Sequence, residues 1–169
     1  DELLPSLGNK LLREIKLAIG RETDFWLREE IGFRTFFRFV QTYPQFYRIL
    51  NEAETFAPRG YHQHLANMVS GYGRAVRRGV AESTLRNMEE REIEAVVYTL
   101  LAARNYLCMR YALTGPLPEF VTDTYMQLVR YGLGANANDS PLPPRAEQKV
   151  PEKTEGPILI WNVRKVGEA

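Results

Sequence analysis

Apolar side chains recur at steps of three and four along about six consecutive segments of this sequence. This spacing puts them on one face of an α-helix, whereas a strand would alternate them. The segments cover 1–19, about 24–42, a short stretch from 44, 58–80, about 87–115, and 118 to 132 or 134. Helix-breaking residues separate them, namely Gly20, Pro44, Pro58, Gly115 and Pro118. The pattern predicts an all-α bundle of about six helices.

Local signals refine these boundaries. Pro44 and Pro58 each suit the first turn of a helix, where the missing N–H costs nothing. Asn87 and Glu90 have the three-residue spacing of a capping box at the start of the long fifth helix. In the second segment, we expect the inner face to consist of Phe33, Phe36, Phe37 and Val40.

The character of the sequence changes after Gly134. Residues 135–156 are rich in Asn, Asp, Ser, Pro and Glu, which is typical of a linker. Residues 157–169 contain the strand formers Ile158, Leu159, Ile160, Trp161 and Val163. We therefore expect a helical domain over 1–134, a linker, and an irregular or strand-forming tail. The tail would be a swapped strand or the beginning of a fused domain, because one strand is not stable alone.

Charge and cysteine usage limit the classes of function. The net charge is +1 over 169 residues, so no strong field attracts nucleic acid or an anionic membrane. The single cysteine, Cys108, forms no disulfide framework, which fits a reducing compartment. No signal peptide and no membrane-spanning apolar run is visible. We expect a cytoplasmic protein without membrane contact.

No pattern of catalytic, metal-binding or cofactor-binding residues is present. The acidic residues at 89, 90, 92 and 94 fit the N-terminus of a helix better than paired acid–base catalysis. His62 and His64 are two residues apart, do not share a helix face, and have no third ligand. The Gly71–Arg74 stretch lacks the third glycine and the preceding strand of a dinucleotide loop. We expect neither an enzyme nor a resident metal or cofactor.

Aromatic residues are the one compositional excess, with 9 Tyr and 8 Phe. Core packing explains most of them, but each buried tyrosine hydroxyl also needs a polar partner. The alternative is a cavity between the second, third, fourth and fifth helices that binds a small, largely apolar or aromatic ligand. The candidate ligand-binding residues are Trp26, Phe33, Phe37, His64, Met68, Tyr72, Tyr98 and Asn105.

The fifth and sixth helices are the candidate dimer surface. Tyr98, Ala102, Met109 and Ala112 add a second apolar strip to the fifth helix, and a helix apolar on two sides is covered on two sides. Arg104 lies in this apolar helix and needs an anion, which Glu94, Asp123, a partner chain or a ligand could supply. The candidate interface residues are Val97, Leu101, Arg104, Cys108, Tyr111, Tyr125 and Leu128.

Three stretches together resemble the C-terminal regulatory domain of the TetR family of transcription regulators. Asp1-Glu2-Leu3-Leu4 is similar to the start of that family's connecting helix, immediately after the helix-turn-helix. The aromatic stretch from Phe36 to Leu50, with Tyr43-Pro44-Gln45-Phe46-Tyr47, resembles its fifth and sixth helices. A long helix, the break at Gly115-Pro116-Leu117-Pro118 and a last helix ending in Tyr131-Gly132-Leu133-Gly134 resemble its dimerising pair. The resemblance covers residues 1–134.

The resemblance implies a ligand-sensing domain of a transcriptional repressor. It implies a homodimer with a four-helix interface, and a first helix that transmits ligand binding to a DNA-binding domain. The helix-turn-helix is absent from this chain, so contact with DNA would belong to the parent protein. The extension after Gly134 departs from the family pattern. Two alternatives stay open: a structural dimerisation module without a ligand, and a helical fragment of a fused enzyme.

Overall fold

The computed structural model describes residues 2–112 and 115–135, and these residues form an all-α bundle without strands. The helices are α1 (Leu3–Ile19), α2 (Phe25–Thr42), α3 (Pro44–Phe56), α4 (Pro58–Ala81), α5 (Glu90–Tyr111) and α6 (Glu119–Leu133). The predicted fold class is therefore confirmed. The predicted strand-like tail at 157–169, and the predicted linker apart from Ala135, lie outside the described residues.

Most helix starts follow from the local sequence. The Asp24 carboxylate accepts a hydrogen bond from the Leu27 N–H at 2.8 Å and caps α2. Pro44 and Pro58 occupy the first turns of α3 and α4, as predicted. The predicted capping box at Asn87 and Glu90 was placed wrongly.

The capping box of α5 is formed by Glu89 and Glu92 instead. The Glu89 backbone is extended and its side chain accepts from the N–H of residue 92, while the Glu92 carboxylate accepts from the Glu89 N–H at 2.8 Å. Glutamate is a less frequent first partner than Ser, Thr, Asp or Asn. Asn87 was therefore the better candidate by residue preference, although the helix begins two residues later.

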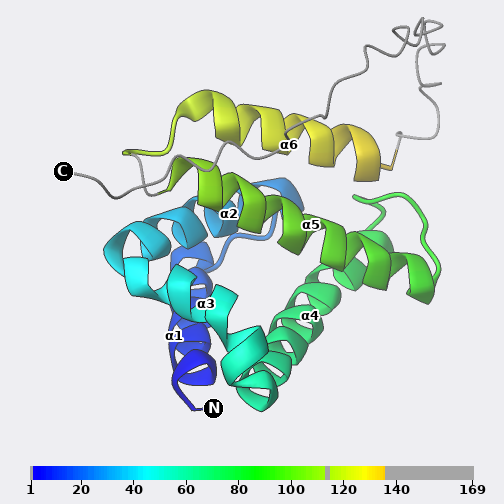
Figure 1. The fold of residues 1–169 in the computed structure, drawn as a ribbon. Coiled ribbons are helices and arrows are strands. Elements are labelled where there is room, and N and C mark those ends of the chain that lie inside the picture. The colour runs from blue at the N-terminus through cyan, green and yellow to red at the C-terminus, as the bar shows by residue number, and fades with distance from the viewer. Residues whose placement is uncertain (1, 113–114, 136–169) are drawn as a thin grey trace, which may run out of the picture.

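Helix α2 is the central helix of the bundle. It packs against α1, α3, α5 and α6, and buried residues lie on most of its faces. Phe33, Phe37 and Val40 are completely buried, as its apolar spacing predicted. Helices α1 and α4 pack against each other, with α3 covering them on the side that faces the viewer in Figure 1. No helix in the described ranges has both the length and the apolar character needed to cross a bilayer.

Helix α6 lies at the edge of the bundle, at the top of Figure 1, away from the N-terminal end of α1. It packs mainly on α2, where the rings of Phe33 and Tyr125 stack with centroids 4.2 Å apart. Its C-terminal end is held by the α4–α5 connection, because the Arg86 N–H donates to the Leu133 carbonyl at 2.8 Å. Helix α6 is therefore held in two ways: its inner face packs on α2, and its C-terminal end is hydrogen-bonded to the α4–α5 connection.

Candidate functional site

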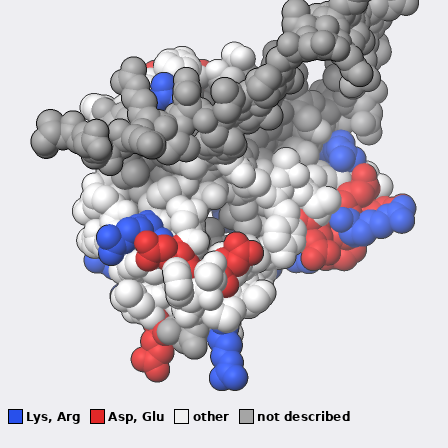
Figure 2. Space-filling view, in the orientation of Figure 1, with Lys and Arg blue, Asp and Glu red and all other residues white. Residues whose placement is uncertain are grey.

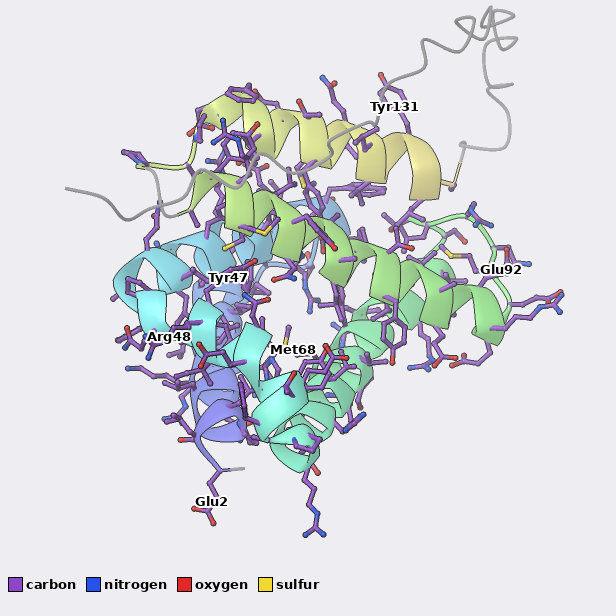
Figure 3. The ribbon with its side chains drawn as sticks, viewed as in Figure 1. Glu2, Tyr47, Arg48, Met68, Glu92 and Tyr131 are labelled. Carbon is purple, nitrogen blue, oxygen red and sulfur yellow. The ribbon has the colours of Figure 1, made fainter. Side chains whose placement is uncertain are left out.

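A cavity of about 340 Å³ lies between α1, α3, α4 and α5, with Phe36 of α2 at its inner end. Its inner wall is apolar and includes the buried residues Leu11, Phe36 and Phe46. In Figure 2 the visible face is hollowed between α3 and α5, in mainly uncharged surface with acidic side chains beside it. Met68 lies between α3, α4 and α5 in Figure 3. The cavity thus lies among the helices where the sequence predicted a ligand site, except that α1 also forms a wall and α2 contributes only Phe36.

Four of the eight predicted ligand-binding residues line this cavity: His64, Met68, Tyr98 and Asn105. The other four lie elsewhere. Phe33 and Phe37 are completely buried in the core around α2, and Trp26 packs edge-on against Phe25 beside Arg130. Tyr72 belongs to a buried polar cluster. Periodicity showed which side chains point inward, but it did not show which part of the interior is empty.

His64 is the buried histidine of the cavity wall, and its position depends on a glycine in α1. A Cβ atom on Gly8 would lie 2.1 Å from the His64 Nδ1 atom, so only glycine leaves room for the ring. Phe46 packs against the other side of the imidazole, with ring centroids 6.1 Å apart. Burial lowers the pKa of His64, which keeps the imidazole neutral at pH 7. His64 therefore offers the cavity a neutral donor or acceptor.

Asn105 places an amide in the same cavity. Its side-chain oxygen is buried and accepts no hydrogen bond from the described residues. Leaving a buried polar atom without a partner costs about 1–3 kcal/mol. A bound molecule or water in the cavity would offset this cost.

Beside the cavity, Glu29, Tyr72, Arg104 and Tyr125 form a buried polar cluster from four helices. The Glu29 Oε1 atom accepts hydrogen bonds from Arg104 at 2.5 Å, Tyr72 at 2.5 Å and Tyr125 at 2.6 Å. Arg104 also donates to the hydroxyl of Tyr72 at 2.9 Å and to that of Tyr125 at 3.3 Å. Arg104 and Glu29 are only 7% and 5% exposed. Every charged group of the cluster therefore has a partner within the chain.

The cluster corrects the prediction for Arg104. Its anion is Glu29 of α2, whereas Glu94 and Asp123 are exposed and lie outside the cluster. Burial opposes the charge on Arg104, but the attraction of Glu29 and the interactions with Tyr72 and Tyr125 together outweigh it and raise the arginine pKa. Burial, reinforced by Glu29, raises the pKa of Tyr125 to about 12. Arg104 and Tyr125 therefore keep their protons at neutral pH, which makes them unsuited to proton transfer.

Most predicted interface residues are not on the surface. Val97, Arg104, Cys108 and Tyr125 are buried in the core of a single chain, and Leu101 lines the cavity. Tyr111 packs against Phe120, with centroids 5.9 Å apart. The predicted residues of α5 belong mainly to the inward strip of this helix, and that strip packs into the core of a single chain. Leu128 alone is strongly exposed, at 71%.

Besides Leu128, two further large apolar side chains are exposed on α6, Phe120 and Tyr131. Their spacing of eight and three residues puts them on one stripe of the helix. Tyr131 points away from the bundle in Figure 3 and is 78% exposed. On α5, Tyr98, Ala102 and Met109 are exposed as expected, whereas Ala112 is buried.

The two histidines at 62 and 64 separate in the structure. His62 is exposed and its Nδ1 atom lies 2.6 Å from the Pro58 carbonyl oxygen, while His64 points into the cavity. Within residues 2–112 and 115–135, no three His, Cys, Asp or Glu side chains converge on a point that could hold a metal ion.

Three residues of the site are not among those that the sequence predicted. Gly8 resembles any helical glycine, Glu29 resembles a surface residue of an amphipathic helix, and Glu54 lies at the cavity mouth. The spacing within α2 does indicate that Glu29 faces the core, because Glu29 lies one turn from both Phe25 and Phe33.

No protein-family model matches this chain. No curated protein shows significant sequence similarity to it either.

Proposed function

We propose that this chain is a ligand-binding regulatory domain of the kind found in TetR-like transcription regulators. The cavity carries this proposal, because a native interior is otherwise packed with few voids larger than a water molecule. Its volume of about 340 Å³ is within the usual size of small-molecule sites, about 300–1,000 Å³. An apolar wall with a few polar groups is also the usual composition of such a site.

The cavity has a direct structural connection to α1, the helix proposed to transmit the signal. Leu11 and Ile15 of α1 line the cavity, and Gly8 contacts the His64 ring. A ligand that moves the His64 ring therefore acts on α1. A coupling of about 1–3 kcal/mol between ligand and the position of α1 would be enough for regulation.

The proposal includes a homodimer formed through α6. Three large apolar side chains, Phe120, Leu128 and Tyr131, form a stripe that is largely exposed although the Phe120 ring contacts Tyr111 at its edge. A second copy covers such a stripe with the simplest symmetry. This arrangement keeps the cavity mouth, between α3 and α5, apart from the stripe on α6.

The direct test is binding of 1-naphthylmethanol, a neutral aromatic probe, measured by titration calorimetry. We expect saturable binding of one probe per chain. Met68→Trp, which fills the cavity, should abolish binding, whereas Leu17→Trp on the exposed side of α1 should not. Binding that is unchanged in Met68→Trp would contradict the cavity as the site.

The regulatory part of the proposal needs a separate measurement. Hydrogen exchange of the α1 amides, Leu3–Ile19, should change when the probe binds, because α1 forms part of the binding wall. The amides of the α4–α5 connection, residues 82–89, which do not line the cavity, serve as an internal reference. If the probe binds and the exchange of the α1 amides does not change, the regulatory part of the proposal is wrong and only ligand binding remains.

A further inference from the structure

We propose that the cavity selects organic cations: molecules with an apolar body of one or two rings and a single positive charge. This inference rests on the proposed ligand-binding function and specifies its ligand class. It follows from the charges that line the cavity and from the groups that already neutralise them.

The two formally charged side chains of the lining are Arg104 and Glu54. Arg104 is neutralised from outside the lining, by the ion pair with Glu29 at 2.5 Å. The Glu29 oxygen also accepts from two tyrosine hydroxyls, which holds it in place. The charges are then +1 for Arg104, −1 for Glu29 and −1 for Glu54, which leaves −1 for the cavity.

Glu54 carries this remaining charge at the cavity mouth. No Lys, Arg or His of the described residues lies within ion-pair distance of its carboxylate. Its neighbour on the same helix, Glu52, is paired with Arg48 at 3.7 Å and does not line the cavity. Glu54 is therefore the one acidic group of the lining that can bind an incoming cation.

The surroundings of Glu54 favour a cation with an apolar body. Tyr61 and Tyr98 line the same mouth, and aromatic faces attract organic cations. Burial raises the pKa of Tyr61, and the nearby negative charge of Glu54 raises it further. Behind the mouth, Leu11, Phe46 and Met68 accommodate the apolar part.

The same groups disfavour an anionic ligand. An anion would be repelled by Glu54 at the entrance. Arg104 offers an anion little net positive charge in return, because the buried carboxylate of Glu29 already pairs with its guanidinium. His64 adds no positive charge, since it is buried and neutral.

The experiment compares three molecules with the same naphthalene body: 1-naphthylmethylammonium, 1-naphthylmethanol and 1-naphthylacetate. Titration calorimetry at pH 7 and low salt measures their dissociation constants for the full chain. We expect the cation to bind at least about ten-fold tighter than the alcohol, with the acetate weakest, since unscreened charges a few ångströms apart interact strongly at a protein surface. Added salt should reduce the preference.

Glu54→Gln is the matched test of the residue. This variant should lose the preference for the cation over the alcohol and keep its affinity for the alcohol. Glu52→Gln removes an equal charge two residues away, outside the cavity, and should retain the preference. A comparable thermal transition of both variants establishes that each is folded.

The outcomes separate the two proposals. If the alcohol binds but the cation binds no better, or the preference survives Glu54→Gln, the cation inference is wrong and the binding cavity stands. If the acetate binds tightest, the charge assignment is reversed. If none of the three probes binds, the proposed function and this inference both fail.

Discussion

At the scale of single residues, the buried pair of Glu29 and Arg104 explains why four helices meet where they do. Removing two charges from water is costly, and their attraction repays this only when every remaining polar atom is also paired. Tyr72 and Tyr125 add hydrogen bonds to both members of the pair, so the cluster connects α2, α4, α5 and α6. The stability of the protein should therefore depend on the complete cluster.

Glu29→Leu tests this dependence. It leaves the buried Arg104 without an anion, and we expect the free energy of unfolding to fall by about 3–5 kcal/mol in urea denaturation. Glu29→Leu combined with Arg104→Met should recover part of the loss, because no uncompensated charge remains. Arg48→Gln, which breaks an exposed pair, serves as the control. Strictly additive effects of the two buried substitutions would contradict the coupling.

Gly8 and Gly132 provide a second comparison at this scale. In Gly8→Ala the new methyl group overlaps the His64 ring, at 2.1 Å from Nδ1, so we expect a loss of about 1–3 kcal/mol of stability. A Cβ atom on Gly132 meets no other atom within 4 Å, and Gly132→Ala should stabilise α6 by about 0.4–1 kcal/mol. Thermal unfolding measures both effects: the melting temperature should fall in Gly8→Ala and rise in Gly132→Ala. Equal effects would show that His64 moves freely into the cavity.

At the scale of elements, the start of α5 depends on a pair of carboxylates. Glu92 accepts the Glu89 N–H, and this backbone hydrogen bond lowers the pKa of Glu92 below its ordinary value of 4.5. A carboxyl group whose pKa is lower in the folded state stabilises the fold above its unfolded pKa, and this contribution is lost as the pH falls through the folded value.

The corresponding prediction concerns the pH dependence of Glu92→Ala. Its melting temperature should lie below that of the unchanged chain at pH 7, and the difference should shrink when the pH falls below 4.5. Glu94→Ala, on an exposed residue of the same helix outside the capping box, is the control. A difference that stays constant down to acid pH would mean that the charge of Glu92 has no part in the cap.

At the scale of the whole molecule, the two features on which the proposed function depends are the cavity mouth and the apolar stripe on α6. They lie on different helices, and α2 and the buried cluster lie between the cavity and α6. Arg104 lines the cavity and donates to Tyr125 of α6. This contact is a physical route by which an occupied cavity could influence the proposed dimer.

Leu128→Glu tests the dimer. A charged side chain in the middle of the stripe should convert a dimer to a monomer in sedimentation experiments without a loss of helical content, because Leu128 is 71% exposed in the single chain. Leu17→Glu introduces the same charge at an equally exposed leucine of α1, at 74%, and should leave the association unchanged. A monomeric starting protein would remove the dimer from the proposal.

The positions of the helices followed from the sequence, because apolar spacing and helix-breaking residues act locally. The spacing of Phe33, Phe37 and Val40 indicated the buried face of α2, and Pro44 and Pro58 indicated the starts of α3 and α4. The α5 capping box was predicted two residues too early, because residue preference favours Asn87 over Glu89 as the first residue of a helix cap.

The cavity and the charge cluster were decided only by the tertiary structure. Whether an inward-facing aromatic residue fills the core or borders a void depends on helices far apart in the sequence, so Phe37 and Tyr98 could not be separated by periodicity. Arg104 visibly needed an anion, but its partner lies 75 positions away on α2. Local spacing determines which face of a helix is buried, whereas the packing of distant helices determines what that face contacts.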